Sequence, residues 1–292
     1  MLYYNIAFRS LLAACLLAIF SFTSAVSAQS GTKPLVVTSI KPLAIIVKSA
    51  FPQHVQVEYV MPAAQSPHDV VLKLSDIRKL SAADVVLWIG PDFETRAAKQ
   101  FSAIAESKLV TAMDLVDHEQ MLLTEDSHEH DHHEHDFDPH IWLSPTLASQ
   151  LVKKLSMRLN IPAQEIFSLS AKKSSKDLLV AAKGGSYIVH HQALGYFIDE
   201  FELQPGLTIR DMMGKQQGAK TQYHLRADGE KLGVSCVFVE PQHGHKDAMA
   251  VANDLGVPLQ AIDILALNYQ SKLPSYESYI YGIAEQFSAC FK

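Results

Sequence analysis

The sequence has few basic residues, few cysteines and, beyond its first thirty positions, no long apolar run. The chain has 25 lysines and arginines against 31 aspartates and glutamates, and it contains no cluster of basic residues that could bind a phosphate backbone. Nucleic-acid binding is therefore disfavoured. No later stretch approaches the about 18 consecutive apolar residues of a membrane-spanning helix. With 292 residues, of which 48% are hydrophobic and 19% charged, the chain has the composition of a globular protein with one large or two average domains.

The first 28 residues are expected to be a secretory signal. Arg9 precedes an apolar run over 11–22, and the small residues of 24–28 follow it. We expect cleavage after Ala28 and export to the periplasm, as a monomer that does not itself insert into the membrane. Lipid attachment at Cys15 is disfavoured, because it would leave an untrimmed apolar N-terminus.

Two cysteines, Cys236 and Cys290, remain after removal of the signal. An even pair in an exported chain favours a disulfide, since that compartment is oxidising. Two inert buried thiols are the alternative.

Short β-branched runs alternate with helical patterns along the rest of the chain, which is typical of βαβ units and parallel sheets. We expect helices over 43–50, 75–83 and 94–107. The pattern predicts an α/β protein with two lobes, each with a mainly parallel sheet flanked by helices, joined by a long linker helix. The expected strands are 35–40, 55–61, 85–89 and 109–113 in the first half and 187–189, 234–239 and 258–262 in the second.

The domain boundaries follow from changes in this pattern. An N-terminal lobe is expected over 29–160 and a C-terminal lobe over 185–292. Between them, 161–184 is expected to be the linker helix, separated from the preceding helical span near Asn160 and stopped by two glycines at 184 and 185.

Half of the 14 histidines lie between residues 118 and 140, most of them in a polar insert over 120–137. Such a tract is too polar to form a core, and the simplest interpretation is a solvated acidic loop. Interspersed histidines and carboxylates also predict a weak, multivalent accessory metal chelator. Its histidines are His128, His130, His132, His133 and His135.

Four other metal-competent residues follow expected strands: His68, His140, His191 and Asp263. In open α/β sheets, ligands bind beyond the carboxyl ends of the strands. Two of the four come from each half of the chain, so they could converge only between the lobes. Three neutral imidazoles with one oxygen suit tetrahedral Zn²⁺.

Glu240 and the remaining histidines are other residues that could contact a metal ion. Glu240 follows a strand and is expected to accept a hydrogen bond from a ligand imidazole. His190 should point away from His191, because successive strand residues alternate in direction. His243 and His245 are expected in a solvent-exposed turn, with a second weak metal site as the alternative. Ordinary polar roles are expected for His54, His118 and His224.

Motifs throughout the chain resemble the zinc-specific solute-binding proteins of bacterial ABC importers. They are Val-Thr-Ser-Ile-Lys-Pro-Leu at 37–43, Ser-Pro-His-Asp at 66–69, His-Ile-Trp-Leu-Ser-Pro at 140–145, His-Gln-Ala-Leu-Gly-Tyr-Phe at 191–197 and Cys-Val-Phe-Val-Glu-Pro-Gln at 236–242. The resemblance covers 34–290, with the motifs in the family's order and spacing.

This resemblance implies a high-affinity zinc receptor, with two lobes bridged by a long rigid helix, that delivers Zn²⁺ to the membrane permease of an ABC transporter. It implies His68, His140 and His191 as ligands, with Asp263 or water in the fourth position. Manganese-binding relatives carry a carboxylate in place of His191, and the expected disulfide matches the zinc branch. The chain departs from the family at Pro67, where a glutamate is common, and in its additional histidines at 243 and 245.

Other functions remain open at the level of sequence. A manganese or iron receptor of the same family is the nearest alternative, and a periplasmic zinc buffer or metallochaperone that works through the insert is another. An exported zinc hydrolase is disfavoured, because no HExxH motif or general base at a recognisable spacing is present. We therefore expect no enzymatic activity.

Overall fold

The computed structural model describes residues 32–123, 137–269 and 273–292, and the chain from Lys33 to Lys292 clusters as one unit. The expected signal peptide and the five histidines of the insert lie outside the described residues. Within the described part, no helix is both long enough and apolar enough to cross a membrane.

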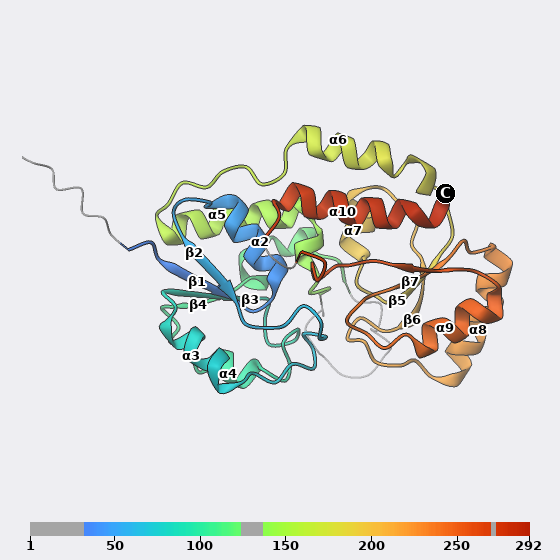
Figure 1. Ribbon diagram of the computed structural model, residues 1–292, viewed down its shortest axis with the longest axis horizontal. Helices are drawn as coiled ribbons and strands as arrows, with labels where there is room; N and C mark the ends of the chain where they lie inside the picture. Colours follow the sequence, from blue (N-terminus) through green and yellow to red (C-terminus); the bar gives the residue numbers. More distant parts are fainter. Residues whose placement is uncertain (1–31, 124–136, 270–272) are drawn as a thin grey trace, which may run out of the picture. The chain divides into compact units, whose positions relative to one another are not determined.

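Two parallel four-stranded sheets organise the described residues (Figure 1). The strand order is β2-β1-β3-β4 in the first sheet and β6-β5-β7-β8 in the second. The two sheets therefore have the same topology: in each, the second strand along the chain is at one edge and the fourth is at the other. This confirms the predicted pair of parallel α/β lobes. The strands are β1 (Leu35–Thr38), β2 (Gln56–Tyr59), β3 (Val85–Trp88), β4 (Leu109–Thr111), β5 (Ile188–His191), β6 (Leu207–Arg210), β7 (Val237–Val239) and β8 (Leu259–Ala261).

Helices flank both sheets, and α10 runs alongside α6 (Figure 1). Because both faces of each sheet are covered, the inner strands β1, β3, β5 and β7 are almost wholly buried. The helices are α2 (Lys41–Ala50), α3 (Leu74–Ala82), α4 (Ala98–Ser102), α5 (Pro145–Leu159), α6 (Leu169–Leu178), α7 (Gly195–Glu200), α8 (Ala219–Leu232), α9 (Lys246–Leu255) and α10 (Tyr276–Ser288).

The segment between the lobes differs from the expected continuous helix. Asn160 ends α5 in the left-handed conformation, with φ 52°, and residues 161–167 are not helical. In this stretch Gln164 N–H donates to Ala50 O, which ties it to α2 rather than to a helix of its own. The helix starts only after Ser168, whose hydroxyl accepts from Ala171 N–H. The linker therefore contains a ten-residue helix, α6, preceded by extended chain.

Two further elements differ from the sequence expectation. Strand β6 was missed, because it has only four residues and follows Pro205 and Gly206 closely. The helix expected over 94–107 shrinks to the five residues of α4. Ahead of it, the carboxylate of Glu94 accepts from Ile89 N–H and Gly90 N–H, which holds this segment as a turn.

The predicted disulfide between Cys236 and Cys290 is present, with a Cα–Cα distance of 5.7 Å. It joins the start of β7 to the end of the chain after α10, and the Cys236 side chain is fully buried.

Hydrogen bonds from Lys41 and Trp142 connect the first lobe to the chain segment after β8. The Lys41 ammonium donates to Ala266 O at 2.7 Å and to Tyr269 O at 2.5 Å, and Trp142 Nε1–H donates to Ile264 O at 3.1 Å. These contacts hold together the two sides of the pocket described next.

Candidate metal centre

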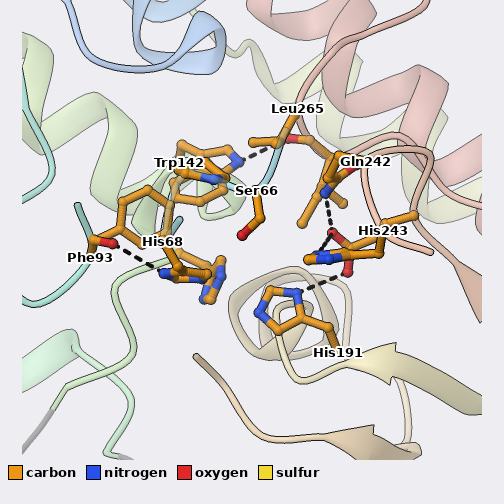
Figure 2. Close-up of a pocket in the computed structure, with 12 residues that line it drawn as sticks. Ser66, His68, Phe93, Trp142, His191, Gln242, His243 and Leu265 are labelled. Carbon is orange, nitrogen blue, oxygen red and sulfur yellow. Dashed lines mark hydrogen bonds and ion pairs between the residues drawn. The ribbon is translucent and has the colours of Figure 1, made fainter. Parts of the chain in front are cut away.

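Three buried imidazoles meet between the two sheets (Figure 2). His68 lies in the loop that follows β2, His140 immediately precedes the short helical turn Ile141–Leu143, and His191 is the last residue of β5. Each is at most 5% exposed, and one nitrogen of each lies within 4.8 Å of the others. The structure thus brings together the three histidines that the sequence singled out, although they are 51 to 123 positions apart.

Each of these imidazoles has its Nδ1 next to a hydrogen-bond acceptor. His68 Nδ1 lies 3.1 Å from Phe93 O, and His140 Nδ1 lies 2.7 Å from Asp138 Oδ1. His191 Nδ1 lies 2.9 Å from Glu240 Oε1. Because an acceptor at Nδ1 fixes the proton there, Nε2 of each ring keeps the lone pair that binds a metal. Oriented imidazoles of this kind favour Zn²⁺.

Burial and mutual proximity make His68 a weak base. Desolvation, reinforced by the neighbouring His140 and His191, lowers the pKa of His68 to about 3. Neutral imidazole is the form that binds a metal, so His68 is available as a ligand at every physiological pH.

His191 and Glu240 form a coupled, fully buried pair. Burial lowers the pKa of His191, but attraction and hydrogen bonding by the Glu240 carboxylate outweigh it, and the net pKa is raised. Burial likewise raises the pKa of Glu240, but His191 reverses that effect and the net pKa is lowered. Without metal, the pair therefore favours an imidazolium next to a carboxylate.

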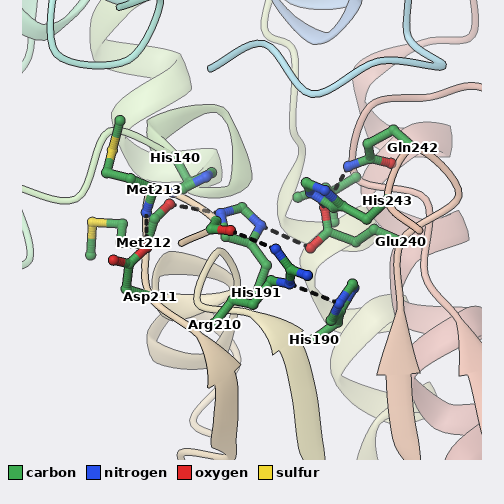
Figure 3. A network of polar contacts seen from close by, with 12 residues as sticks. His140, His190, His191, Arg210, Asp211, Met212, Met213, Glu240, Gln242 and His243 are labelled. Atoms are coloured by element: carbon green, nitrogen blue, oxygen red, sulfur yellow. Dashed lines mark hydrogen bonds and ion pairs between the residues drawn. The ribbon is translucent and has the colours of Figure 1, made fainter. Parts of the chain in front are cut away.

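The second nitrogen of His191 also has an acceptor nearby, as Figure 3 shows: Nε2 lies 2.7 Å from Met212 O. This carbonyl belongs to the turn after β6, in which Asp211 Oδ1 accepts from Met213 N–H and Lys215 N–H. A metal ion that binds His191 through Nε2 must displace the Met212 carbonyl.

Asp263 does not join the cluster. Its carboxylate accepts from Leu267 N–H and Asn268 N–H, both at 2.8 Å, and so stabilises the turn after β8. The next two residues, Ile264 and Leu265, line the pocket instead. Among the described residues, Asp263 is not in the groups of ligand atoms that lie within 4.8 Å of one another, and its role as the fourth ligand stays a prediction.

His243 lies next to the cluster, although the sequence favoured an exposed turn for it and left a second weak metal site as the alternative. It lines the pocket and is 14% exposed at its side chain, so the expected solvent-exposed turn is wrong for this residue. His243 N–H donates to Glu240 O, and this tight turn places its imidazole next to the Glu240 carboxylate (Figure 3). With His191 and Glu240 it forms a second group of ligand atoms within 4.8 Å of one another. The signal in the sequence was the His-Gly-His run directly after a strand.

His190 belongs to a separate polar network (Figure 3). Its Nε2 lies 2.9 Å from Asp247 Oδ1, and Arg210 Nε–H donates to Asp247 Oδ2 at 2.7 Å. Burial is the largest influence on the pKa of His190 and lowers it. The contacts agree with the expected alternation along β5, which turns only His191 toward the other two imidazoles.

The histidine-rich insert starts and ends close to this cluster. Leu123 and Phe137 form an antiparallel bridge on either side of it, and Asp138 N–H donates to Leu122 O. Asp138 in turn orients His140. The accessory chelator predicted for the insert falls on residues outside those described, so its role stays a prediction.

Comparison with known proteins identifies relatives over nearly the whole chain. A family sequence model described as periplasmic zinc-uptake complex component A matches residues 36–165 and 163–290. The high-affinity zinc uptake system protein ZnuA of Yersinia pestis is 28% identical, over 88% of this chain and 91% of its own length. The protein of the same name from Haemophilus influenzae is also 28% identical, over 91% and 97%.

Solved structures show the same fold. The periplasmic zinc-binding protein TroA of Treponema pallidum superimposes with a TM-score of 0.72 at 21% identity, covering 89% of this chain and 99% of that one. A crystal structure of ZnuA gives a TM-score of 0.69 at 21% identity, over 88% and 99%.

Proposed function

This chain belongs to the family of periplasmic zinc-uptake component A, and we propose that it captures Zn²⁺ in the periplasm and delivers it to the permease of an ABC transporter. The observation that carries the proposal is the set of three buried imidazoles, each with Nδ1 next to an acceptor and with nitrogens within 4.8 Å of one another. The names of its relatives, which include high-affinity zinc uptake proteins, support zinc as the cargo.

We assign His68, His140 and His191 as the ligands and Asp138 and Glu240 as the residues that orient two of them. Three nitrogen ligands distinguish this site from the oxygen-rich sites of hard cations such as Mg²⁺ and Ca²⁺, and they favour zinc over manganese. Three protein ligands leave the fourth tetrahedral position to water or to another side chain. No catalytic role is assigned to the site.

The delivery step implies that the exported protein carries the ion to a membrane partner. Residues 1–28 would serve export and be removed after Ala28.

A zinc competition titration tests the proposal. We expect one tight site per chain in the wild type, and a loss of more than about 100-fold in affinity on His140→Ala, because removing a ligand should exceed the 10–100-fold cost of losing an outer hydrogen-bond partner. The matched control is His54→Ala, which removes an exposed histidine away from the cluster.

The same titration distinguishes the proposed zinc receptor from a zinc buffer that works through the histidine-rich insert. If the insert were the working part, replacing its five histidines by asparagine would remove most of the bound zinc, whereas His140→Ala would leave it nearly unchanged. That result would overturn the proposed function. Manganese binding tighter than zinc binding by the wild type would likewise contradict the assignment of the cargo.

A further inference from the structure

A second set of ligand atoms lies next to the three imidazoles and shares one of them. His191, Glu240 and His243 each place a ligand atom within 4.8 Å of the other two. All three residues come from the C-terminal lobe: His191 ends β5, Glu240 follows β7 directly, and His243 lies in the next turn. This set therefore exists without any contribution from the first lobe.

The Glu240 carboxylate lies between the two imidazoles (Figure 3). Its Oε1 is 2.9 Å from His191 Nδ1, and its Oε2 is 3.8 Å from His243 Nε2. Ligand atoms on a tetrahedral zinc ion with bonds of 2.0–2.1 Å lie about 3.3 Å apart, so these separations bracket the value that a bound ion needs. Two imidazoles and one carboxylate, with a position left for water, are a known zinc ligand set.

Unused polar atoms also face this set. His243 Nε2 lies 3.8 Å from Glu240 Oε2, which is beyond hydrogen-bond distance. Gln242, which lines the same pocket, has a buried Oε1 without a partner among the described residues, while its amide nitrogen donates to Glu240 Oε2. A metal ion and its water would provide partners for both atoms.

The two nitrogens of His191 face two different positions. Nδ1 lies next to Glu240 and faces the second set, whereas Nε2 lies next to the Met212 carbonyl instead (Figure 3). A ligand histidine normally donates its other N–H to a carboxylate or backbone carbonyl. If Nδ1 binds the ion, Nε2–H already has Met212 O at 2.7 Å. If Nε2 binds it, Nδ1–H already has Glu240.

We propose that His191, Glu240 and His243 form a second zinc position on the C-terminal lobe, occupied in alternation with the position formed by His68, His140 and His191. The positions exclude each other, because one neutral imidazole has a single lone pair for a metal. Glu240 binds the ion directly in one position and orients His191 in the other. Each position displaces one contact of His191: the second requires the proton between Nδ1 and Glu240 Oε1 to leave, and the first requires the Met212 carbonyl to move away from Nε2.

This inference rests on the proposed function, since it places the same cargo in the same pocket. It gives the ion a site on one lobe that does not depend on the imidazoles of the other. Capture and release then become a transfer between two sites that share His191.

The test uses the full exported chain with the five insert histidines replaced by asparagine, so that only the pocket is measured. In this background, His68→Ala with His140→Ala removes the first position alone. We expect this double variant still to bind one Zn²⁺ or Co²⁺ per chain, with weaker affinity and a changed Co²⁺ absorption spectrum. Adding His243→Phe should then weaken binding by more than about 100-fold, beyond the loss expected of an outer partner. Adding His224→Phe, at an exposed helical position, is the matched control.

Long-range ¹⁵N–¹H spectra of the imidazoles give a second readout, because they identify the nitrogen that binds the metal. We expect the metal on His191 Nδ1 in the double variant and on Nε2 in the parent background. Circular dichroism checks that each variant is folded.

Two results would overturn the inference while leaving the proposed function intact. In one, the parent binds zinc and the folded double variant binds none. In the other, the double variant binds zinc but His243→Phe changes nothing. A parent chain that binds no zinc would refute both proposals.

Discussion

Protons compete with zinc for the ligand imidazoles, so zinc affinity should fall as the pH falls. We expect fewer than three competing protons, although three imidazoles bind the ion. Burial, with the charges of neighbouring imidazoles, lowers the pKa of His68 to about 3. At pH 5 only about 1% of this side chain is protonated, so it requires no proton to leave when zinc binds. His191 behaves differently, because Glu240 raises its net pKa against the effect of burial and its proton competes with zinc as the pH falls.

The expected magnitude follows from the number of competing protons. Each one weakens apparent zinc affinity by up to about tenfold per pH unit below its pKa. Between pH 7 and pH 5, three competing imidazoles would weaken binding by up to about 10⁶-fold, two by about 10⁴-fold and one by about 100-fold. With His68 removed from the count, we expect a loss of at most about 10⁴-fold.

The assay is a chelator competition titration from pH 5 to pH 7.5, with the insert histidines replaced so that they add no protons of their own. Glu240→Gln provides the internal comparison. Without the carboxylate, the pKa of His191 should fall, so the slope near pH 7 should become shallower even though affinity at pH 8 drops by about 10–100-fold. A slope of three protons per zinc in the wild type would refute the reasoning, and so would an unchanged slope in Glu240→Gln.

The remaining predictions concern the fold and the insert. Replacing Cys236 and Cys290 by serine opens a loop with a sequence separation of 54 and should lower the free energy of unfolding by about 4 kcal/mol in urea titrations; a loss below about 1 kcal/mol would contradict the chain-entropy estimate. Burial raises the pKa of Glu94 from 4.5 to about 7, so between pH 4.5 and pH 7 the folded state binds more protons than the unfolded state. The free energy of unfolding should therefore fall by about 3 kcal/mol as the pH rises through this range. Glu94→Gln should remove this component, and wild-type and variant stabilities that change in parallel from pH 4.5 to pH 8 would show that it is absent. Deleting residues 126–136 should leave the tight zinc affinity within a few-fold in calorimetry, and loss of the tight site would show that the insert supplies a ligand.

The sequence alone determined the architecture and the three histidines that the structure brings together. The spacing of apolar residues in strands and helices is a local property of the sequence. The alternation of strands and helices, and hence the two parallel sheets, could therefore be predicted from it. Only short elements such as β6 were missed. In parallel sheets the carboxyl ends of the strands meet at one edge, so the positions of His68 and His191 after their strands carried information about the pocket. The disulfide followed from the count of cysteines in an exported chain.

Only the tertiary structure decided which groups surround these imidazoles. Asp263 and Glu240 both follow strands, but their carboxylates have different partners. Backbone N–H groups of the next turn donate to Asp263, whereas Glu240 contacts His191. The geometry of the turn after each strand decides which partner the carboxylate has. The turn after β7 likewise places His243 in the pocket rather than in solvent. The linker, expected as one helix, is partly extended because Gln164 bonds to α2. Strand patterns place a residue at the end of a strand, but the hydrogen bonds of the following turn and of neighbouring segments decide what its side chain contacts. The patterns of apolar and polar residues do not show those bonds.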